Sequence, residues 1–186
     1  MKELSLNILD IAQNSVQAEA TEIGISIEEE GKYLTVTITD DGYGMKKDFL
    51  MNVLDPFTTT RTTRNVGLGL PLLKMAAEQA EGYLEIDSVH RDDDPENHGT
   101  TVKAVFNREH IDCPPLGDIV GTVVLLVQAA SFAPRYVYRH VKNGKESRLD
   151  TNELHEQLGE DIPLSEPEVL GFVSAYLEEQ EAALEL

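Results

Sequence analysis

The chain has 186 residues, of which 41% are hydrophobic and 26% are charged, a composition typical of a folded globular protein. Its 34 acidic against 15 basic residues give a formal net charge of −19, which excludes nucleic acids and anionic membranes as partners because surfaces of like charge repel. A single cysteine excludes an internal disulfide, and no apolar run approaches the roughly 20 residues of a membrane span. Since the first residues lack a signal-peptide pattern, we expect a cytoplasmic protein.

The first half of the chain predicts alternating helices and strands. Apolar residues recur every three or four positions from the N-terminus to about residue 20, which is typical of an amphipathic helix. Strict alternation at 23–27 and 34–38 predicts two strands joined in a hairpin. The same reasoning predicts a short helix at 46–54, an exposed Thr-rich loop at 58–65, a helix at 70–80 and strands at 83–89 and 100–106.

A run of Cys113, Pro114 and Pro115 marks a domain boundary, because Pro cannot continue a helix interior or a strand ladder. We therefore expect a first domain at 1–110 and a small α+β appendage at 111–186. The appendage contains an apolar segment at 119–130 that fits a buried helix or a buried strand, and its length favours the helix. An Asn143-Gly144 hairpin between strands at 136–141 and 145–149 follows, and then helices at 150–158 and 165–184 whose capping-box patterns are Asp150/Glu153 and Ser165/Glu168.

The charge is uneven along the chain. Between Gly42 and Ala77 there are five basic residues and only two acidic ones, although the chain as a whole is strongly acidic. A local excess of positive charge is what an acidic protein needs in order to hold an anion. A chance excess of three charges is not rare, so charge alone favours chance over an anion site.

Asp10 and Asn14 stand four residues apart on the first predicted helix, which places both side chains on one face. An amide oxygen can ligate Mg²⁺, and a carboxylate one turn away can take a proton from water or a hydroxyl. Taken alone, the pair fits a solvated polar face better than a binding site.

Asp40 ends the second predicted strand. The alternation of the strand at 34–38 continues to Asp40, which therefore points to the buried face of the sheet, while Asp41 points away. A buried carboxylate needs hydrogen-bond donors, and the exocyclic amine of adenine would serve. Gly42 and Gly44 allow a sharp turn and the close approach of a flat ligand. The alternative is a strand-end Asp in a tight turn.

A glycine-containing segment from Arg64 to Pro71 opens the predicted helix at 70–80. Free backbone N–H groups at a helix start form a cradle for anions, and Gly67 and Gly69 keep side chains out of it. The P-loop pattern and the dinucleotide fingerprint are both absent from the chain. Thr100 shares its strand parity with inward-facing residues, so its hydroxyl is expected to reach Asp40 directly or through a water, unless it bonds to its own backbone.

In their order and spacing, these motifs resemble those of the GHKL superfamily, the Bergerat-fold ATPases that include gyrase, heat-shock chaperones, sensor histidine kinases and MutL. Asp10 to Ser15 resembles the family's asparagine box, Asp40 to Gly44 its first glycine box and Gly67 to Leu70 its second. Asp55 to Thr60 resembles the start of the ATP lid, and Gly99 to Thr101 the closing strand. The resemblance covers about residues 1–107.

The resemblance implies a two-layer α/β sandwich of the Bergerat type, with helices covering a mixed or antiparallel sheet and ATP between the layers. It implies that Asn14 ligates Mg²⁺ and that Asp40 binds adenine, helped by Gly42, Gly44 and Thr100. Phosphate would be held by Gly67, Leu68, Gly69 and Leu70, with Arg61 or Arg64 closing over it. Asp10 would take the catalytic position.

Asp10 also departs from the family pattern, because this position usually carries Glu or His and Asp is one methylene shorter. The short lid is similar to that of anti-sigma serine kinases, and the C-terminal part to ATP-binding proteins encoded beside iron-only hydrogenases in anaerobic bacteria. We therefore expect Mg-ATP binding with hydrolysis or phosphoryl transfer to Ser or Thr of a partner protein. The alternative is a non-catalytic module whose ATP-ordered lid controls binding to a protein partner. A homodimer is a further expectation.

Overall fold

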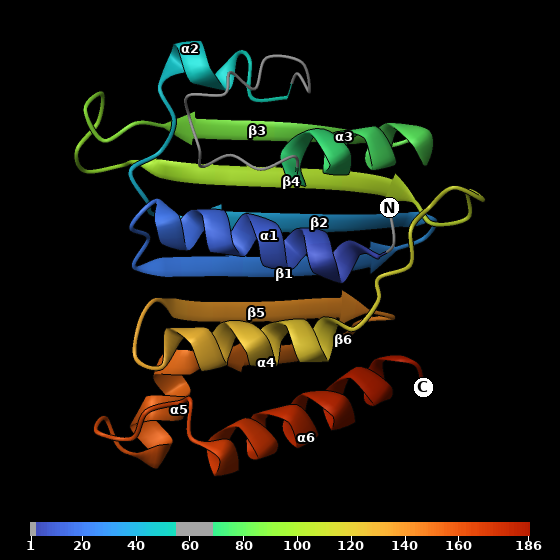
Figure 1. Ribbon diagram of the computed structural model, residues 1–186. Coiled ribbons are helices and arrows are strands. Elements are labelled where there is room, and N and C mark those ends of the chain that lie inside the picture. The colour runs from blue at the N-terminus through green and yellow to red at the C-terminus, as the bar shows by residue number, and fades with distance from the viewer. Residues whose placement is uncertain (1–2, 55–68) are drawn as a thin grey trace.

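The computed structural model describes residues 3–54 and 69–186 of the chain (Figure 1). The expected helices and strands form in this part of the chain, with ends shifted by a few residues. The helices are α1 (Leu4–Gln17), α2 (Lys47–Leu50), α3 (Gly69–Gln79), α4 (Ile119–Ala130), α5 (Thr151–Leu158) and α6 (Pro167–Leu184). The strands are β1 (Glu22–Glu30), β2 (Tyr33–Asp40), β3 (Tyr83–Val89), β4 (Gly99–Asn107), β5 (Arg135–Lys142) and β6 (Lys145–Asp150).

The strands form one mixed, open sheet in the order β3-β4-β2-β1-β5-β6. All neighbouring strands are antiparallel except β1 and β5, which run parallel. In this register Asp40, the last residue of β2, lies opposite Ile23 of β1 and opposite Thr100 of β4. The sheet therefore brings Asp40 and Thr100, which are far apart in sequence, side by side at one end.

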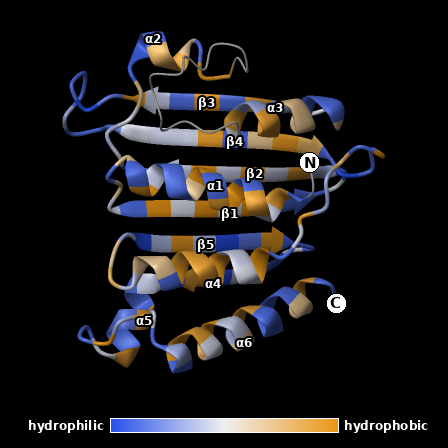
Figure 2. Ribbon diagram, in the orientation of Figure 1, coloured by the Kyte–Doolittle hydropathy of each residue, from blue (hydrophilic) through white to orange (hydrophobic). Residues whose placement is uncertain are grey.

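The core lies between the sheet and the layer of helices α3, α1 and α4, which cover one face (Figure 1). The α1 side chains at the helical spacing Leu4, Ile8 and Ile11 are almost fully buried there. Helix α4 is apolar along most of its length (Figure 2), which explains why its period alone did not distinguish a buried helix from a buried strand. The two-layer α+β architecture expected from the sequence is confirmed.

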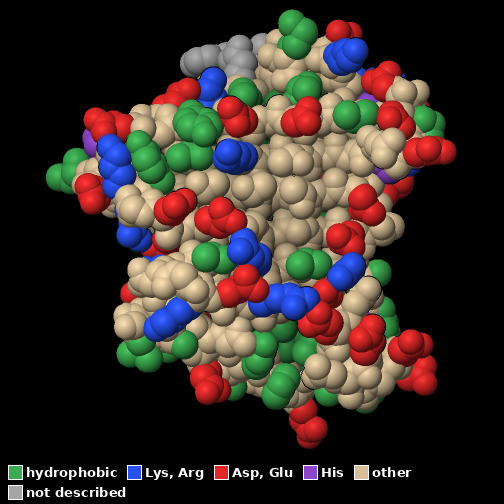
Figure 3. All heavy atoms as spheres, turned by 180° about the vertical axis from the view of Figure 1, so that it is seen from behind, with side chains coloured by type: hydrophobic (Ala, Val, Ile, Leu, Met, Phe, Trp, Pro, Cys, Tyr) green, Lys and Arg blue, Asp and Glu red, His purple; other side chains and the backbone are tan. Residues whose placement is uncertain are grey.

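Among the described residues, no helix lies over the central strands on the other face of the sheet, and Figure 3 shows that face largely as polar side chains and backbone. Across β1 and β2 the residues on that face are small and polar, such as Ser26, Thr35 and Thr37, and they are half-buried. An antiparallel region with one buried and one solvated face has this alternation. The residues of the sheet that line the functional site lie on its other, core-facing side.

The C-terminal residues extend the same sheet, because β5 pairs with β1. Arg135 of β5 binds the buried Asp150 through Nε and Nη2, at 3.0 and 2.6 Å, and contacts Glu22 of β1 through Nη1 at 2.8 Å. Helix α6 packs against β6 and α4. That 1–110 and 111–186 fold as separate units remains a prediction.

The two expected capping boxes have different outcomes. Asp150 caps α5, because its carboxylate accepts a hydrogen bond from the backbone N–H of Asn152 at 3.0 Å. The expected cap at Ser165 is wrong: α6 begins one residue later, after Glu166, and has no side-chain cap. The Ser165 hydroxyl instead lies 3.0 Å from the hydroxyl of Ser131, which follows α4.

Candidate functional site

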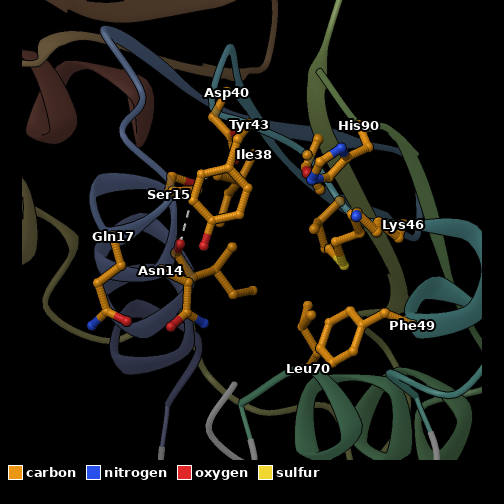
Figure 4. A pocket seen from close by; sticks show the side chains of 16 residues that line it. Asn14, Ser15, Gln17, Ile38, Asp40, Tyr43, Lys46, Phe49, Leu70 and His90 are labelled. Carbon is orange, nitrogen blue, oxygen red and sulfur yellow. Dashed lines mark hydrogen bonds between the residues drawn. The ribbon is translucent and has the colours of Figure 1, made fainter. Parts of the chain in front are cut away.

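A cavity of about 530 Å³ opens between α1, the core-facing side of the sheet and the segment that follows β2 (Figure 4). This volume is within the range of small-molecule sites. Among the residues that line it are Asn14, Ser15, Asp40, Tyr43, Gly44, Lys46, Phe49, Leu70, His90 and Thr100. The structure thus brings Asn14, Asp40, Gly44, Leu70 and Thr100, all expected from the sequence to serve one site, to the same cavity.

Asp40 lies on the core-facing side of β2, as its parity predicts. Its Oδ2 accepts a hydrogen bond of 2.6 Å from the Ser15 hydroxyl, and its Oδ1 accepts one of 2.9 Å from the backbone N–H of Gly42. Burial raises the pKa of the Asp40 carboxyl above its ordinary value, even though these two hydrogen bonds favour the charged form. Each carboxylate oxygen has a second lone pair, so Asp40 retains acceptor capacity for a ligand.

The raised pKa of Asp40 makes a prediction for the nucleotide-free protein. The folded state holds this proton at pH values where the unfolded chain, with a pKa near 3.8, has released it. The charged carboxylate therefore costs stability as the pH rises through the folded-state pKa. We expect Asp40→Asn to gain stability relative to wild type as the pH rises from the unfolded-state pKa of 3.8 through the raised folded-state pKa of Asp40, measured by urea unfolding. If the free energy of unfolding of Asp40→Asn instead fell relative to that of wild type as the pH rises, the predicted sign would be wrong.

Two glycines after β2 shape the turn beside Asp40. A Cβ on Gly42 would lie 2.7 Å from the carbonyl oxygen of Ala18 and 3.0 Å from Oδ1 of Asp40. Gly44 has a φ of +69°, and a Cβ there would lie 1.9 Å from the carbonyl oxygen of Val89. The turn therefore packs too closely for a side chain at either position.

Asp41 points away from the cavity, as expected. Its Oδ1 accepts hydrogen bonds from the backbone N–H groups of Thr21 and Glu22, at 2.7 and 2.9 Å, and its Oδ2 accepts one from the Thr21 hydroxyl. Asp41 therefore fixes the start of β1 next to the end of β2, a structural role that the sequence did not reveal.

Asp10 and Asn14 share one face of α1 but have different surroundings. The Asn14 side chain lines the cavity and makes no hydrogen bond to residues 3–54 or 69–186. Asp10 instead lies against the first residue of α3, since a Cβ on Gly69 would lie only 1.9 Å from its Oδ2. A free amide oxygen and a carboxylate one turn away match the oxygen donors that Mg²⁺ prefers.

Thr100 lines the cavity, but its hydroxyl pairs differently from the expectation. It lies 2.8 Å from the hydroxyl of Ser88 on β3, which also accepts a hydrogen bond of 2.8 Å from the backbone N–H of Met45. The side chain that donates a hydroxyl hydrogen to Asp40 is Ser15. The expected direct hydrogen bond from the Thr100 hydroxyl to Asp40 is therefore not made within the described residues, although the Thr100 backbone does hydrogen-bond to the Asp40 carboxyl and lowers its pKa.

Four of the expected site residues, Arg61, Arg64, Gly67 and Leu68, lie outside the described residues, as does the lid segment at 55–60. Sequence reasoning missed Ser15, Tyr43, Lys46 and His90 of the cavity wall. Ser15 was within reach of the pattern, because it occupies the position after Ile8 and Ile11 in the buried stripe of α1. No sequence pattern predicted His90, because its position depends on how the loop at 90–98 folds back against the turn after β2.

Two general features of the described residues bear on the site. No group of three or more His, Cys, Asp or Glu side chains in that part of the chain could hold a metal ion by itself. Among the helices of the described residues, none is long and apolar enough to cross a membrane.

Residues 1–110 match the model of the family described as histidine kinase-, DNA gyrase B- and HSP90-like ATPase. The "Probable C4-dicarboxylate sensor kinase" of Bacillus subtilis is 34% identical over 74 residues, which cover 40% of this chain and 14% of that protein. Sporulation kinase A of the same organism is 29% identical over 109 residues, which cover 59% of this chain and 17% of that protein. The chain thus spans less than a fifth of these relatives.

Two solved structures share the fold over most of the chain. The ATPase domain of Aquifex aeolicus MutL complexed with ADP superimposes with a TM-score of 0.52 at 14% identity, covering 86% of this chain and 68% of that one. The N-terminal domain of a DNA repair protein gives a TM-score of 0.56 at 15% identity, and the match covers 80% of this chain and 52% of that one. The chain belongs to the family of histidine kinase-, gyrase- and HSP90-like ATPases, the GHKL superfamily.

Proposed function

We propose that this chain binds Mg-ATP in the cavity between α1 and the sheet, and that it hydrolyses ATP or transfers its γ-phosphoryl group to a Ser or Thr hydroxyl of a partner protein. Membership of an ATPase family supports ATP as the ligand. The observation that carries the proposal is the Asp40 carboxylate, which lies in the wall of a largely apolar cavity with acceptor capacity to spare.

Asp40 would accept a hydrogen bond from the exocyclic amine of adenine. Ser15 and the backbone of Gly42 hold the carboxylate in place before the nucleotide arrives, so little further ordering is needed on binding. Gly44 leaves the rim of the cavity free for the base, and the Thr100 hydroxyl, fixed by Ser88, offers a further polar group.

Asn14 would hold Mg²⁺ through its side-chain oxygen, which no described residue occupies. Bound Mg²⁺ neutralises part of the triphosphate charge, which a chain of net charge −19 otherwise repels. The start of α3 at Gly69 and Leu70 would present backbone N–H groups to phosphate oxygens. Gly67, Leu68, Arg61 and Arg64, which lie outside the described residues, are proposed for the same role.

Asp10 would act as the general base. In hydrolysis it takes a proton from the attacking water, and in transfer it takes the proton of the partner's hydroxyl. The new bond forms at the γ-phosphorus while its bond to the bridging oxygen breaks, and the departing ADP keeps that electron pair. The Asp10 carboxylate lies beside Gly69 at the first turn of α3, which is the turn proposed to bind the phosphates.

Substitution of Asp10 tests this role. We expect Asp10→Asn to bind Mg-ATP as wild type does and to lose at least about 100-fold in turnover at saturating ATP, because the amide cannot accept the proton. The measurements are calorimetric titration and release of inorganic phosphate. Gln13→Ala is a matched control, since Gln13 lies on the same helix and is exposed.

The second candidate function is a non-catalytic module in which ATP only controls a surface for a protein partner. The specific observation that favours it is the place of Asp10, which lies against Gly69 and does not line the cavity. Turnover that is equal in wild type and Asp10→Asn, together with tight ATP binding, would support this candidate. The identity of the partner and a homodimer remain proposals.

A further inference from the structure

The loop at 90–98, between β3 and β4, forms part of the cavity wall and is attached to the turn after β2. The Arg91 backbone N–H donates to the Tyr43 carbonyl at 2.9 Å, and Nδ1 of His98 lies 2.6 Å from the Gly42 carbonyl oxygen. The Arg91 guanidinium also lies 5.6 Å from the centre of the Tyr43 ring. These contacts hold the loop at the end of the cavity where Asp40 lies.

His90 is the residue of this loop that lines the cavity. Its Nδ1 accepts a hydrogen bond of 3.1 Å from the backbone N–H of Asp92, and only 14% of its side chain is exposed. The tautomer in which Nδ1 accepts this hydrogen bond carries the ring hydrogen on Nε2. Within residues 3–54 and 69–186, Nε2 has no hydrogen-bond partner. His90 therefore has one fixed nitrogen and one free donor.

The neighbours of His90 fix the orientation of its ring. The carboxylate of Asp92 lies 3.3 Å from Nδ1 of His90 and 3.5 Å from Nζ of Lys46, another residue of the cavity wall. The centres of the His90 and Tyr43 rings are 6.2 Å apart with the planes at 56°. A base between two rings needs roughly 7 Å and parallel planes. The two rings therefore form one wall, and the base does not lie between them.

We propose that His90 binds the nucleoside part of the ligand by donating Nε2–H to one of its hydrogen-bond acceptors, a ring nitrogen or a ribose oxygen. The inference rests on the proposed function, which puts adenine at Asp40. In Figure 4 the imidazole extends into the cavity from the side opposite Ser15 and Asp40, while Asn14 and Leu70 lie at the other end. The contact is therefore with the nucleoside and not with the phosphates.

The test compares variants of the full chain by calorimetric titration with ATP, ADP and adenosine in the presence of Mg²⁺. His90→Phe keeps an aromatic ring but removes the donor, and we expect affinity for all three ligands to fall by the same factor, about five- to tenfold. His90→Gln restores an N–H donor, and its affinity should stay within about twofold of wild type. A factor that grows with the number of phosphates would overturn the assignment to the nucleoside.

His110 provides a matched control. Its Nδ1 accepts a hydrogen bond of 3.2 Å from the backbone N–H of Asp112, the same local arrangement as at His90, but His110 does not line the cavity. His110→Phe should bind all three ligands as wild type does. Equal weakening by His110→Phe and His90→Phe would overturn the proposal, because both substitutions would then act through loop structure.

The outcomes also separate this inference from the proposed function. If wild type binds none of the three ligands, the proposed function fails. If Asp40→Asn loses binding while His90→Phe binds like wild type, only the role of His90 fails. Far-UV circular dichroism and thermal unfolding of each variant establish that it is folded. If His90→Phe does not fold, His90→Leu removes the same donor and should show the same uniform loss of affinity, and wild-type affinity of His90→Leu would overturn the proposal.

Discussion

Asp40→Asn is expected to weaken ATP binding by at least about 100-fold, because it removes a hydrogen bond to a charged acceptor and puts a second donor into the site. In the wild type, both oxygens of Asp40 are acceptors, one for Ser15 and one for the backbone N–H of Gly42. An amide cannot accept at both positions. One of its ends carries hydrogens, which would face either the N–H of Gly42 or the Ser15 hydroxyl, and that end can no longer accept a hydrogen bond from the adenine amine.

The measurement is calorimetric titration of both proteins with ATP, repeated with adenosine to separate the base from the phosphates. Asp41→Asn is the control, because Asp41 binds Thr21 and Glu22 on the far side of the same turn. It should lose stability and keep its affinity. Equal affinity of wild type and Asp40→Asn would remove the basis of the proposed function.

The second large effect is expected at Gly44, where Ala should destabilise the fold by more than about 3 kcal/mol. Two costs add there. The φ of +69° disfavours any side chain, and the new Cβ would lie 1.9 Å from the Val89 carbonyl oxygen, so that the backbone itself must move. Such a loss is a large fraction of the free energy of unfolding of a domain of this size.

Gly144→Ala separates the two costs. Gly144 has a similar φ of +73° in the β5–β6 hairpin, but no heavy atom lies within 4 Å of a Cβ placed there. It should therefore lose only about 1 kcal/mol, the cost of the backbone conformation alone. The free energies of unfolding come from urea titrations of the three proteins. Equal losses in the free energy of unfolding for Gly44→Ala and Gly144→Ala would show that the backbone after β2 moves at little cost to accommodate a Cβ.

The elements of this fold follow from local sequence, and their pairing does so only in part. Asn143 and Gly144 have φ values of +54° and +73°, as their hairpin pattern requires. No local sequence pattern indicates that β5 runs parallel to β1. Which strand pairs with β1 depends on packing across the whole sheet. Ser165 shows the same limit, since a contact with Ser131 replaces the expected cap.

The site shows the same division between local and distant information. Asp40 was placed correctly by strand alternation, and the closeness of Gly42 and Gly44 to their neighbours follows from residue type. The partner of the Thr100 hydroxyl was missed because Ser88 lies on the neighbouring strand β3, whose register the sequence does not fix. His90 was missed because its position depends on a long loop folding back onto the turn at Gly42 and Tyr43.

The parallel pairing of β5 with β1 also bears on how the chain can be divided. A fragment that stops at residue 110 would leave β1 as an edge strand, with a row of unpaired backbone donors and acceptors and without Arg135 beside Glu22. An uncovered edge of this kind is a template on which another chain can add a strand. The C-terminal segment therefore covers an edge of the sheet that residues 1–110 alone would leave open.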